Sequence, residues 1–382
     1  MRLGDCCKTN LHTYSDKEKW SLIRYLDTGS ITEGRIDEIQ TLYPGVDKIP
    51  SRARRKASVG DILFSTVRPN QKHYGIIEAG TENLLVSTGF TVVTVDTTIA
   101  DPYFIYYYLT QSSVIESLQA IAEQSTSTYP SIKPSDMEDI ELDLPELETQ
   151  KKIGSTLRML DRKIALNEEI NDNLQQQAAA LFSSLYDRTN TEVRFTDLIQ
   201  ILGGGTPKTG ENTYWNGNIA FFTPKDVGTP YTLITEKTIT EEGLSHCNSR
   251  LYPVNTVFVT ARGTVGKVGM SGVPMAMNQS CYALVGKETH QLLVYFYTLK
   301  AVDRLKHKAS GAVFDAITTR DFESEQIMKL SDDDAKAFLC IAEPMFQKVL
   351  NNCIENLRLS TLRDSLLPKL MSGEVDVSAV QL

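Results

Sequence analysis

Residues 150–186 read QKKIGSTLRMLDRKIALNEEINDNLQQQAAALFSSLY and contain no proline. Apolar residues recur in this segment at alternating spacings of four and three, as in a heptad repeat with filled a and d positions. The seam consists of Ile153, Leu157, Leu160, Ile164, Asn167, Asn171, Leu174, Ala178, Leu181 and Leu185. The pattern predicts one long helix. At ~1.5 Å per residue it would span ~55 Å, so we expect a rigid rod.

A second seam follows between Asp333 and Met371, 185 residues further on, and it has asparagine at the same two places. Its members are Phe338, Ala342, Met345, Val349, Asn352, Asn356, Leu359, Arg363, Leu366 and Leu370. In an antiparallel coiled coil an a layer meets a d layer, so Asn167 would pair with Asn356. Asn171 would then pair with Asn352. Such pairs fix register, because a slip leaves their amides without partners.

The alternative is that each helix packs separately on its own domain, with its asparagines at exposed edges. Two matched asparagine pairs in seams that are otherwise so apolar favour the coiled coil. The repeated seam also predicts that the chain is an internal repeat.

Length and composition restrict the class of protein. A chain of 382 residues exceeds one ordinary core and fits two domains with connectors. No apolar run reaches the ~18 residues of a membrane span and residues 1–10 are polar, so we expect a cytoplasmic protein without a membrane anchor. The six cysteines form no C-x-x-C pair and the five histidines no H-E-x-x-H motif. The sequence therefore indicates no metal, disulfide or cofactor.

The formal net charge of −9 argues against a protein that coats nucleic acid by bulk charge. Local basic clusters are nevertheless present, one at residues 52–56 and another at residues 304–308. The charge is thus uneven along the chain, and local nucleic-acid contacts stay open.

The first globular unit is expected to be rich in strands and then helical. Short apolar runs at residues 62–64 and 91–95 predict strands, and Asp101-Pro102 predicts a helix start. Phe104, Tyr107 and Tyr108 share a face of that helix. They could stack on bases, but at helical spacing we interpret them as core.

The second unit repeats this plan. Residues 59–75 align with residues 253–269 at an offset of 194, which matches Phe64 with Phe258, Thr66 with Thr260, Arg68 with Arg262 and Gly75 with Gly269. Ser131-Ile132 aligns with Ala316-Ile317 at the offset of 185. We therefore predict an α+β protein with two mixed α/β domains in a pseudo-twofold repeat, separated by a long antiparallel two-helix coiled coil. The expected parts are a first domain at 1–146, a central helix at 147–188, a second domain at 189–331, a distal helix at 332–373 and a tail at 374–382.

No catalytic motif is complete. Gly205 and Gly210 have the spacing of a phosphate-binding loop, but Glu211-Asn212 replaces the required Lys-Ser/Thr. Asp136 and Glu148 have a nuclease-like separation without the accompanying lysine. We therefore expect no chemistry from this chain alone.

Two loops carry groups suited to DNA. Arg68 to Lys72 offers a guanidinium, two amides and an ammonium after a strand, and Arg262 to Lys267 repeats the arrangement. Arginine matches the acceptor pair of guanine, and asparagine or glutamine matches adenine. Alternatively, the two arginines tie the strand end to a carboxylate in each domain. Because residues shared by readers of different sequences more often contact phosphate, loss of either arginine is expected to weaken binding on all sequences. Loss of preference at one base would instead identify a direct reader.

Longer motifs resemble a known family. They include residues 204–210, GGTPKTG, then YWNG at 214–217 and FTPKD at 222–226, followed by ITEEG at 239–243, TARGT at 260–264 and MAMNQ at 275–279. The first half has YLDTG at 25–29, VRPN at 67–70 and STGF at 87–90. Together with LPELETQ at 144–150 and LLPKL at 366–370, they resemble the DNA-sequence-specificity subunit of type I restriction-modification systems over nearly the whole chain. The sequence at 332–335 departs from the family, which leaves open how the second helix is capped.

The resemblance implies a mechanism. Each target recognition domain would read one half of a split double-stranded DNA sequence in the major groove, and the helix pair would set the unread spacer. Two modification subunits would dock on this non-catalytic chain and bring S-adenosylmethionine and adenine methylation, and translocating restriction subunits would add cleavage. The competing hypotheses are a self-contained methyltransferase or nuclease and a structural adaptor with two protein- or sugar-binding modules on a coiled-coil rod.

Basic and amide side chains in the loops and motifs are the expected DNA contacts. They are Arg52, Arg54, Arg55, Lys56, Arg68, Asn70, Gln71, Lys72, Thr206, Lys208, Lys225, Arg262, Thr264, Lys267, Asn278 and Gln279.

Overall fold

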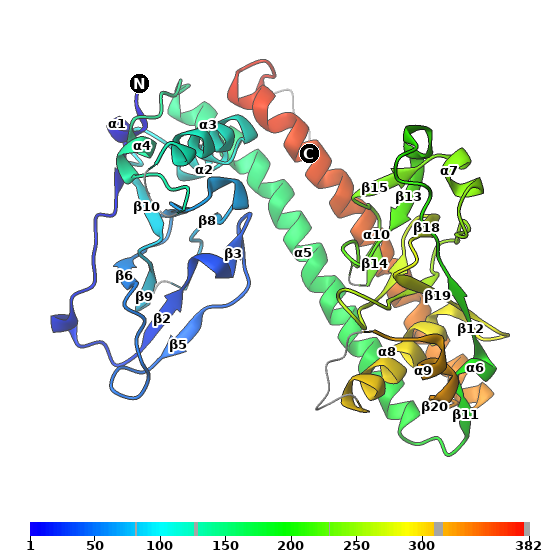
Figure 1. Cartoon of the computed structure of the whole chain (residues 1–382). Helices are drawn as coiled ribbons and strands as arrows, with labels where there is room; N and C mark the ends of the chain where they lie inside the picture. The colour runs from blue at the N-terminus through cyan, green and yellow to red at the C-terminus, as the bar shows by residue number, and fades with distance from the viewer. Residues whose placement is uncertain (81, 126–128, 229, 309–315, 378–382) are drawn as a thin grey trace. The chain divides into compact units, whose positions relative to one another are not determined.

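The computed structural model describes residues 1–80, 82–125, 129–228, 230–308 and 316–377 (Figure 1). Residues 378–382 of the expected tail lie outside the described residues. The chain forms two compact units, the first made of residues 1–163 and 359–382 and the second of residues 164–358. The boundary falls within both long helices, so each unit holds one globular domain together with a part of each helix.

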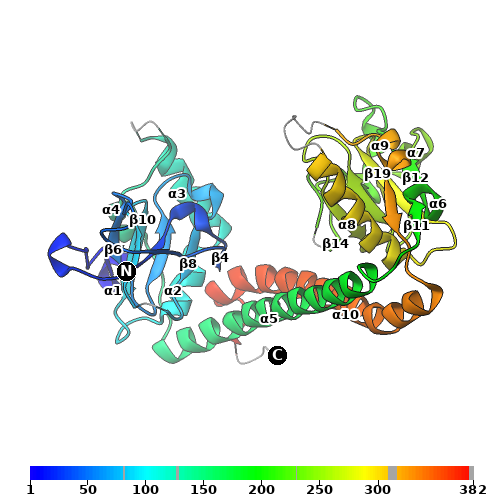
Figure 2. The same ribbon diagram turned by 90° about the horizontal axis from the view of Figure 1, so that it is seen from below.

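The two long helices are α5 (Leu147–Tyr186) and α10 (Asp332–Met371). Both bounds of α10 lie 185 positions after those of α5, so the offset found in the seams holds for the whole helices. They lie side by side in both ribbon views (Figures 1 and 2). The cap of α10 is also explained, because the Ser331 hydroxyl accepts a hydrogen bond from the Asp334 N–H at 3.1 Å.

Both asparagine pairs lie in the second unit and are hydrogen bonded as predicted. Asn167 Nδ2 donates to Asn356 Oδ1 at 2.8 Å, and Asn352 Nδ2 donates to Asn171 Oδ1 at 2.8 Å. Asn167 and Asn352 are fully buried. The pairing is confirmed, and the alternative of two separately packed helices is wrong.

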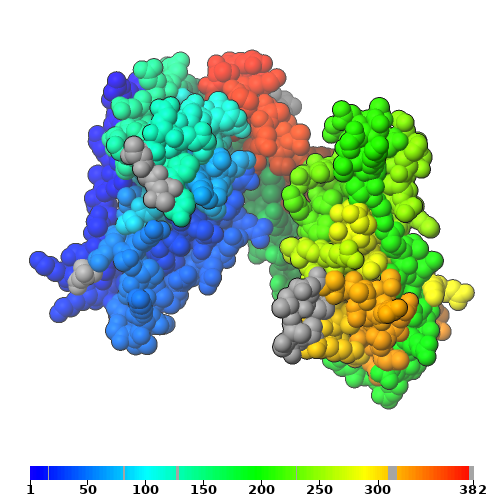
Figure 3. All heavy atoms as spheres, in the orientation of Figure 1, coloured from blue at the N-terminus to red at the C-terminus, as the bar shows by residue number. Residues whose placement is uncertain are grey.

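The described part of the first unit's globular domain has two four-stranded sheets, with orders β1-β10-β7-β8 and β5-β2-β9-β6, and a two-stranded sheet β3-β4. Its strands are β1 (Cys7–Thr9), β2 (Ile23–Leu26), β3 (Ile31–Thr32), β4 (Arg35–Ile36), β5 (Gln40–Leu42), β6 (Ala53–Lys56), β7 (Ile62–Ser65), β8 (Tyr74–Ile76), β9 (Leu84–Ser87) and β10 (Phe90–Val95). Its helices are α1 (Leu3–Cys6), α2 (Pro102–Leu109), α3 (Ser112–Glu123) and α4 (Pro134–Glu138), with short 3-10 turns η1 (Asp16–Glu18), η2 (Thr28–Ser30) and η3 (Pro69–Gln71). In the space-filling view its surface is formed by the strands in blue and the helical segment in cyan to green (Figure 3).

Burial explains why the central strands read as continuous apolar runs. Every residue of β7 is buried, because Phe64 and Ile62 face the helices whereas Leu63 faces the second sheet. On α2, Phe104 and Tyr107 are buried in the same core, and the hydroxyl of the half-buried Tyr108 donates to the Glu141 carbonyl at 2.8 Å. The interpretation of this aromatic cluster as core is confirmed.

The second unit has two corresponding larger sheets, with orders β12-β19-β16-β17-β14 and β15-β13-β18, and a two-stranded sheet β11-β20. Its strands are β11 (Glu192–Arg194), β12 (Ile199–Gly203), β13 (Trp215–Phe222), β14 (Tyr231–Thr232), β15 (Lys237–Ile239), β16 (Val257–Thr260), β17 (Val268–Ser271), β18 (Met275–Met277), β19 (Cys281–Gly286) and β20 (Gln326–Met328). Its helices are α6 (Phe195–Leu198), α7 (Glu241–Ser245), α8 (Gln291–Lys308) and α9 (Thr319–Ser324), with the 3-10 turn η4 (Asn212–Tyr214). Both domains contain parallel strand pairs, β2 with β9 in the first and β13 with β18 and β14 with β17 in the second.

The structure corrects the alignment of the two halves by one residue. Ile132 N donates to the Thr66 carbonyl, and its counterpart Ile317 donates to Ala261 rather than to Thr260. Likewise Leu63 pairs with Gly75, whereas Phe258 pairs with Gly269. Strand β7 therefore matches β16 at an offset of 195. The offset of 194 holds from the end of the following loop, because Ser65 N donates to His73 where Thr260 N donates to Lys267, and Gly75 matches Gly269. The connecting loop is one residue shorter in the second domain, which an ungapped comparison does not detect.

This correction reverses which side chains are equivalent. A shift of one residue exchanges the two faces of a strand. Phe258 lies in the core between the sheets, as Leu63 does, whereas Phe64 faces the helices, as Val259 does. The proposed equivalence of Arg68 with Arg262 is therefore wrong: Arg262 corresponds to Val67, and Arg68 corresponds to Gly263.

Helix α5 contacts α2 of the first domain through a polar face. Asp101 N donates to Oε1 of the buried Gln150 at 3.0 Å. One turn further along α5, the absence of a side chain at Gly154 lets the start of α2 approach closely. At the far end of the contact, the Tyr107 hydroxyl donates to Asp161 at 2.6 Å.

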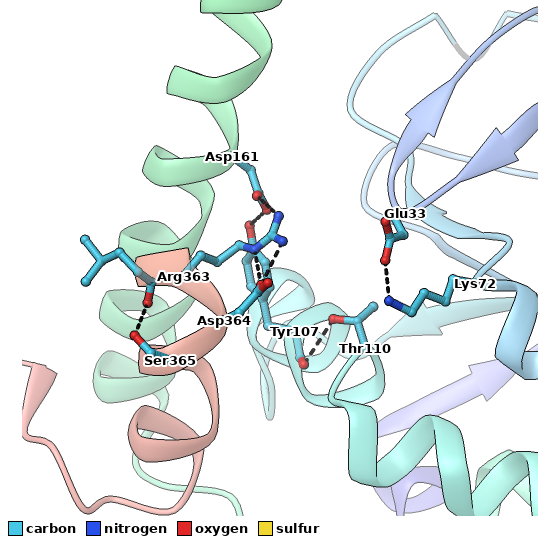
Figure 4. Close-up of polar contacts among 9 residues, drawn as sticks. Glu33, Lys72, Tyr107, Thr110, Asp161, Arg363, Asp364 and Ser365 are labelled. Carbon is cyan, nitrogen blue, oxygen red and sulfur yellow. Dashed lines mark hydrogen bonds and ion pairs between the residues drawn. The ribbon is translucent and has the colours of Figure 1, made fainter. Parts of the chain in front are cut away.

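Arg363 completes this contact from α10 (Figure 4). It occupies a seam position, and its Nη1 lies 2.6 Å from Asp161 while its Nε donates to Asp364 at 2.9 Å. Burial and the Asp161 carboxylate raise the pKa of Tyr107, so its hydroxyl remains a donor. The network lines a cavity of about 340 Å³ with Tyr74 and Tyr106. Arg363, the charged residue of the second seam, thus has one partner on each long helix, Asp161 on α5 and Asp364 on α10. Through Asp161 it is also linked to Tyr107 of the first domain.

Replacing Gly154 by alanine tests the close approach. Alanine normally gains about 1 kcal/mol over glycine inside a helix. Here its Cβ would lie 2.6 Å from Asp101 Oδ1 and 2.9 Å from Tyr103 Cβ. Overpacking costs about 1–3 kcal/mol, so we expect Gly154→Ala to lower the thermal unfolding midpoint. The control is Ser155→Ala on the exposed neighbouring position; equal midpoints for the two variants would contradict the close-packing interpretation.

The second domain contacts the long helices through an aromatic core instead. Phe182 of α5 lies 5.0 Å from Phe296 of α8 and 5.4 Å from Phe338 of α10, measured between ring centroids. All three side chains are buried.

Among the described residues, no helix is both long and apolar enough to span a bilayer.

Candidate nucleic-acid interface

In the second domain, four loops meet at one end of the sheets. They follow β12, β13, β16 and β18 and carry most of the predicted contacts of this half. The Thr206 hydroxyl donates to the Gln279 side chain, and the Thr264 hydroxyl donates to the Pro224 carbonyl at 3.2 Å. Arg262 N donates to the Ser280 carbonyl at 3.3 Å. The structure thus brings Thr206, Lys225, Arg262, Thr264, Asn278 and Gln279 together on connected loops.

Glycine makes this cluster possible. A Cβ on Gly204 would lie 2.2 Å from the Asn278 carbonyl oxygen, and a Cβ on Gly205 would lie 2.6 Å from the Asn248 nitrogen. Gly205 N donates to the Met277 carbonyl at 3.1 Å. The backbone of the glycine-rich segment therefore packs directly on the loop after β18. The segment that fails as a phosphate-binding motif acts as a close-packed support for Thr206.

The first domain has an equivalent cluster. The Thr66 hydroxyl and N–H both donate to the Gly89 carbonyl, at 2.9 and 2.8 Å, and Thr88 N donates to the Arg52 carbonyl at 2.9 Å. These bonds join the loops before β6, after β7 and between β9 and β10. Arg52 and Arg68 therefore lie on connected loops at one end of the sheets.

Buried hydroxyls hold both loops at equivalent positions. Ser65 Oγ accepts from Val67 N at 3.2 Å and donates to the Val67 carbonyl at 3.0 Å. Its counterpart Thr260 donates to the Thr264 carbonyl and accepts from Lys267 N at 2.9 Å. Two buried hydroxyls thus fix the backbone from which Arg68 and Arg262 project. The sequence analysis missed this role, although a small hydroxyl residue ends both strands.

Arg68 and Arg262 are both exposed. Among the residues that the structure describes, neither forms an ion pair with a carboxylate, so the alternative in which each ties its strand end to an acid is not observed. The Arg68 guanidinium lies over the Tyr129 ring, with its carbon 5.2 Å from the ring centroid. Tyr129 was missed because nothing in the sequence connects it with this loop.

The other residues of the Arg68 loop have mixed surroundings. Gln71 is exposed, Asn70 N donates to the Gln119 side chain at 3.3 Å, and Lys72 Nζ lies 2.6 Å from Glu33. An exposed ion pair of this kind exchanges readily with other partners because it contributes little stability. Lys72 therefore stays a predicted phosphate contact.

The remaining residues of the basic cluster at 52–56 disperse along β6 instead of meeting the loops. Arg55 pairs with Val86 and Lys56 with Leu85 after a register shift at Arg54, so the side chains of Arg55 and Lys56 face opposite sides of the sheet. Lys56 is paired with Glu18 and lies 5.2 Å from the Trp20 ring centroid. Burial lowers the pKa of Arg55, and its buried Nη1 has no hydrogen-bond partner among the described residues. These residues stay predicted contacts, but the structure does not place Arg55 and Lys56 on the loop cluster.

Three lysines of the second domain are exposed. Lys225 Nζ lies 3.3 Å from Glu236, and Lys208 uses its carbonyl to accept from Trp215 Nε1 at 3.3 Å. Lys267 holds Thr260 through its backbone, which leaves its side chain at the surface. Gly266 beside it packs close to Lys306, a residue of the basic run at 304–308 that adds positive charge next to this loop.

Comparison with known proteins assigns the chain to a family. The family model of the type I restriction modification DNA specificity domain matches residues 48–176 and again residues 188–329. The two matches cover more than half of the chain, so the chain belongs to this family and holds two copies of its domain.

Individual relatives agree over nearly the whole length. The type I restriction enzyme HindI specificity subunit of Haemophilus influenzae is 24% identical over 98% of this chain and 98% of its own. The MjaIX specificity subunit of Methanocaldococcus jannaschii is 22% identical over 83% of this chain and 78% of its own. The crystal structure of the type I restriction-modification S subunit from M. genitalium shares the fold, with a TM-score of 0.61, 16% identity and coverage of 97% and 95%.

Proposed function

We propose that this chain is the non-catalytic DNA-reading subunit of a type I restriction-modification complex. Each domain reads one half of a bipartite double-stranded target in the major groove, through the loop cluster at the end of its sheets. The observation that carries this proposal is the repetition of one domain with exposed arginine-bearing loops in a chain that belongs to a DNA specificity family.

Chemistry supports a direct readout by these loops. Guanidinium and amide groups form bidentate hydrogen bonds with base edges in the major groove, each worth ~1–3 kcal/mol of discrimination. The lysines near the same loops supply phosphate contacts, which position the protein without carrying sequence information. These loops need rigid support, because a displaced donor cannot form its hydrogen bond with the base. The buried hydroxyls of Ser65 and Thr260 provide that support.

The helix pair serves as the spacer between the two half-sites. Its register would decide how many base pairs separate them, and the buried asparagines Asn167, Asn171, Asn352 and Asn356 would hold that register. Because its proposed target is the DNA of the cell, the proposed location of the protein is the cytoplasm.

Catalysis belongs to partner subunits in this proposal. Two methyltransferase subunits dock on the chain and bring S-adenosylmethionine to an adenine of each half-site, and restriction subunits add cleavage. Partner surfaces also share the phosphate contacts, which suits a reader whose own net charge is −9. An adaptor for proteins or sugars is not proposed, because the family match is to a DNA specificity domain.

Co-expression with the modification subunit encoded beside it tests the proposal. Sequencing of the host DNA for methylated adenine is expected to reveal one split motif with two defined halves and a constant gap. A host that carries the modification subunit alone is the control and should show no such motif. If the assembled complex binds S-adenosylmethionine and the DNA stays unmethylated, the proposal is wrong.

A further inference from the structure

The two recognition domains do not present arginine from the same backbone position. Hydrogen bonds equate Thr66 with Ala261, so the next residues correspond as Val67 with Arg262 and Arg68 with Gly263. The backbone angles agree independently, because Arg68 has φ +48° and Gly263 has φ +82°. The position is left-handed in both domains, and only the first domain places a side chain on it.

A left-handed backbone is unfavourable for arginine and natural for glycine. The following residue, Pro69, restricts Arg68 further. The second domain has glycine, Gly263, at this position, which adopts the left-handed backbone without strain. Stability therefore does not explain why the first domain has arginine there. Strain that persists in an exposed loop is typical of a functional contact.

The surroundings of Arg68 leave its guanidinium available. The side chain is exposed, no described carboxylate pairs with it, and the ring of Tyr129 lies under it at 5.2 Å. At 5.2 Å from the ring centroid the guanidinium is within cation–π distance of Tyr129, and this contact does not use up its N–H donors. The fork is thus free to bind a planar partner with two acceptors.

We propose that Arg68 is a specificity-determining residue of the first domain, which reads a base edge with two adjacent acceptors, as guanine presents in the major groove. This rests on the proposed DNA-reading function and deepens it. A phosphate contact shared by both domains would require equivalent positions, and Arg68 and Arg262 are not equivalent. In this proposal the two domains read DNA from different positions of equivalent loops, the loop after β7 and the loop after β16.

Lys72 offers a matched control within the same loop. It also has a left-handed backbone, with φ +56°, and its counterpart is Gly266, with φ +74°. Arg68→Gly and Lys72→Gly therefore each remove one positive charge and each introduce the residue that the second domain uses. The thermal midpoint is expected not to fall in either variant, so an effect on recognition is separated from a loss of folding.

The experiment compares the wild-type chain and the two variants, each co-expressed with the modification subunit, by the methylated motif in host DNA. Arg68→Gly is expected to lose discrimination at one base pair of one half-site, by about ten- to a hundredfold, and to keep the other half and the gap. Lys72→Gly removes an expected phosphate contact, so it should weaken binding on all sequences and leave the sequence of the methylated motif unchanged. Binding of the assembled complexes to a duplex with the wild-type motif is measured in parallel against salt.

Two results would overturn the inference. Arg68→Gly could keep full sequence preference while the slope of log K against log salt falls by about one, which identifies a phosphate contact. Alternatively, both variants could lose preference equally, which identifies a general loop effect. Failure of the proposed function is distinct, because the wild-type complex itself would then produce no methylated motif.

Discussion

Gly204→Ala is expected to abolish recognition by the second domain. The new Cβ would lie 2.2 Å from the Asn278 carbonyl oxygen and 2.6 Å from that of Met277, and both contacts are with backbone. Neither can move away by a side-chain rotation, so the loops that carry Thr206 and Gln279 must separate. The methylated motif should degenerate in one half and keep the other.

The matched control is Gly203→Ala at the preceding position, where nothing lies within 4 Å of the added Cβ. Overpacking at Gly204 costs about 1–3 kcal/mol, and for a domain of this size each kcal/mol lowers the melting temperature by about 2–4 °C. The two variants are compared by thermal unfolding and by the methylated motif. If they behave alike, the close packing of these loops does not support recognition.

Removing one member of a buried asparagine pair is expected to destabilise the helix pair more than removing both. Asn167→Leu alone takes away the donor to Asn356 Oδ1, and an unpaired buried polar group costs about 1–3 kcal/mol. Asn167→Leu with Asn356→Leu makes an apolar layer, so stability should recover. Register should then loosen, because an apolar layer tolerates a slip that an amide pair does not.

Hydrogen exchange of the amides in α5 and α10 measures local stability, and the gap length of the methylated motif measures register. We expect fast exchange with a constant gap for the single variant, and slow exchange with a mixture of gap lengths for the double variant. A double variant with unchanged exchange and one unchanged gap would show that the pair has no role in register.

The second asparagine layer provides an internal comparison. Asn352 Oδ1 is buried and has no partner among the described residues, whereas Asn171 Nδ2 reaches only the Cys353 sulfur, at 3.6 Å. The first layer is better satisfied, since Asn356 Nδ2 also donates to the Ile164 carbonyl at 3.3 Å. Replacing both members of the second layer by leucine should therefore stabilise the helix pair more than the same change in the first.

Much of the architecture follows from sequence pattern. A heptad seam is local information: its spacing predicts the helix, and the position of Asn167 relative to Asn356 predicts both the antiparallel direction and the layer in which they meet. The strands at 62–64 and 91–95 were predicted from short apolar runs, and the helix start at Asp101 from the Asp-Pro pair, which are also local features of the sequence.

The sequence by itself determined the two long helices, the two-domain repeat and the family. These features depend on the periodicity of apolar residues and on short motifs of consecutive residues. Only the tertiary structure decided which residues of the two halves are equivalent. A single-residue difference in loop length is invisible in an ungapped comparison, yet it exchanges the faces of β7 and β16 and separates Arg68 from Arg262. Hydrogen bonds across the sheet and the left-handed backbone at Arg68 and Gly263 settle the register, because they report where the chain lies in space rather than which residues follow one another.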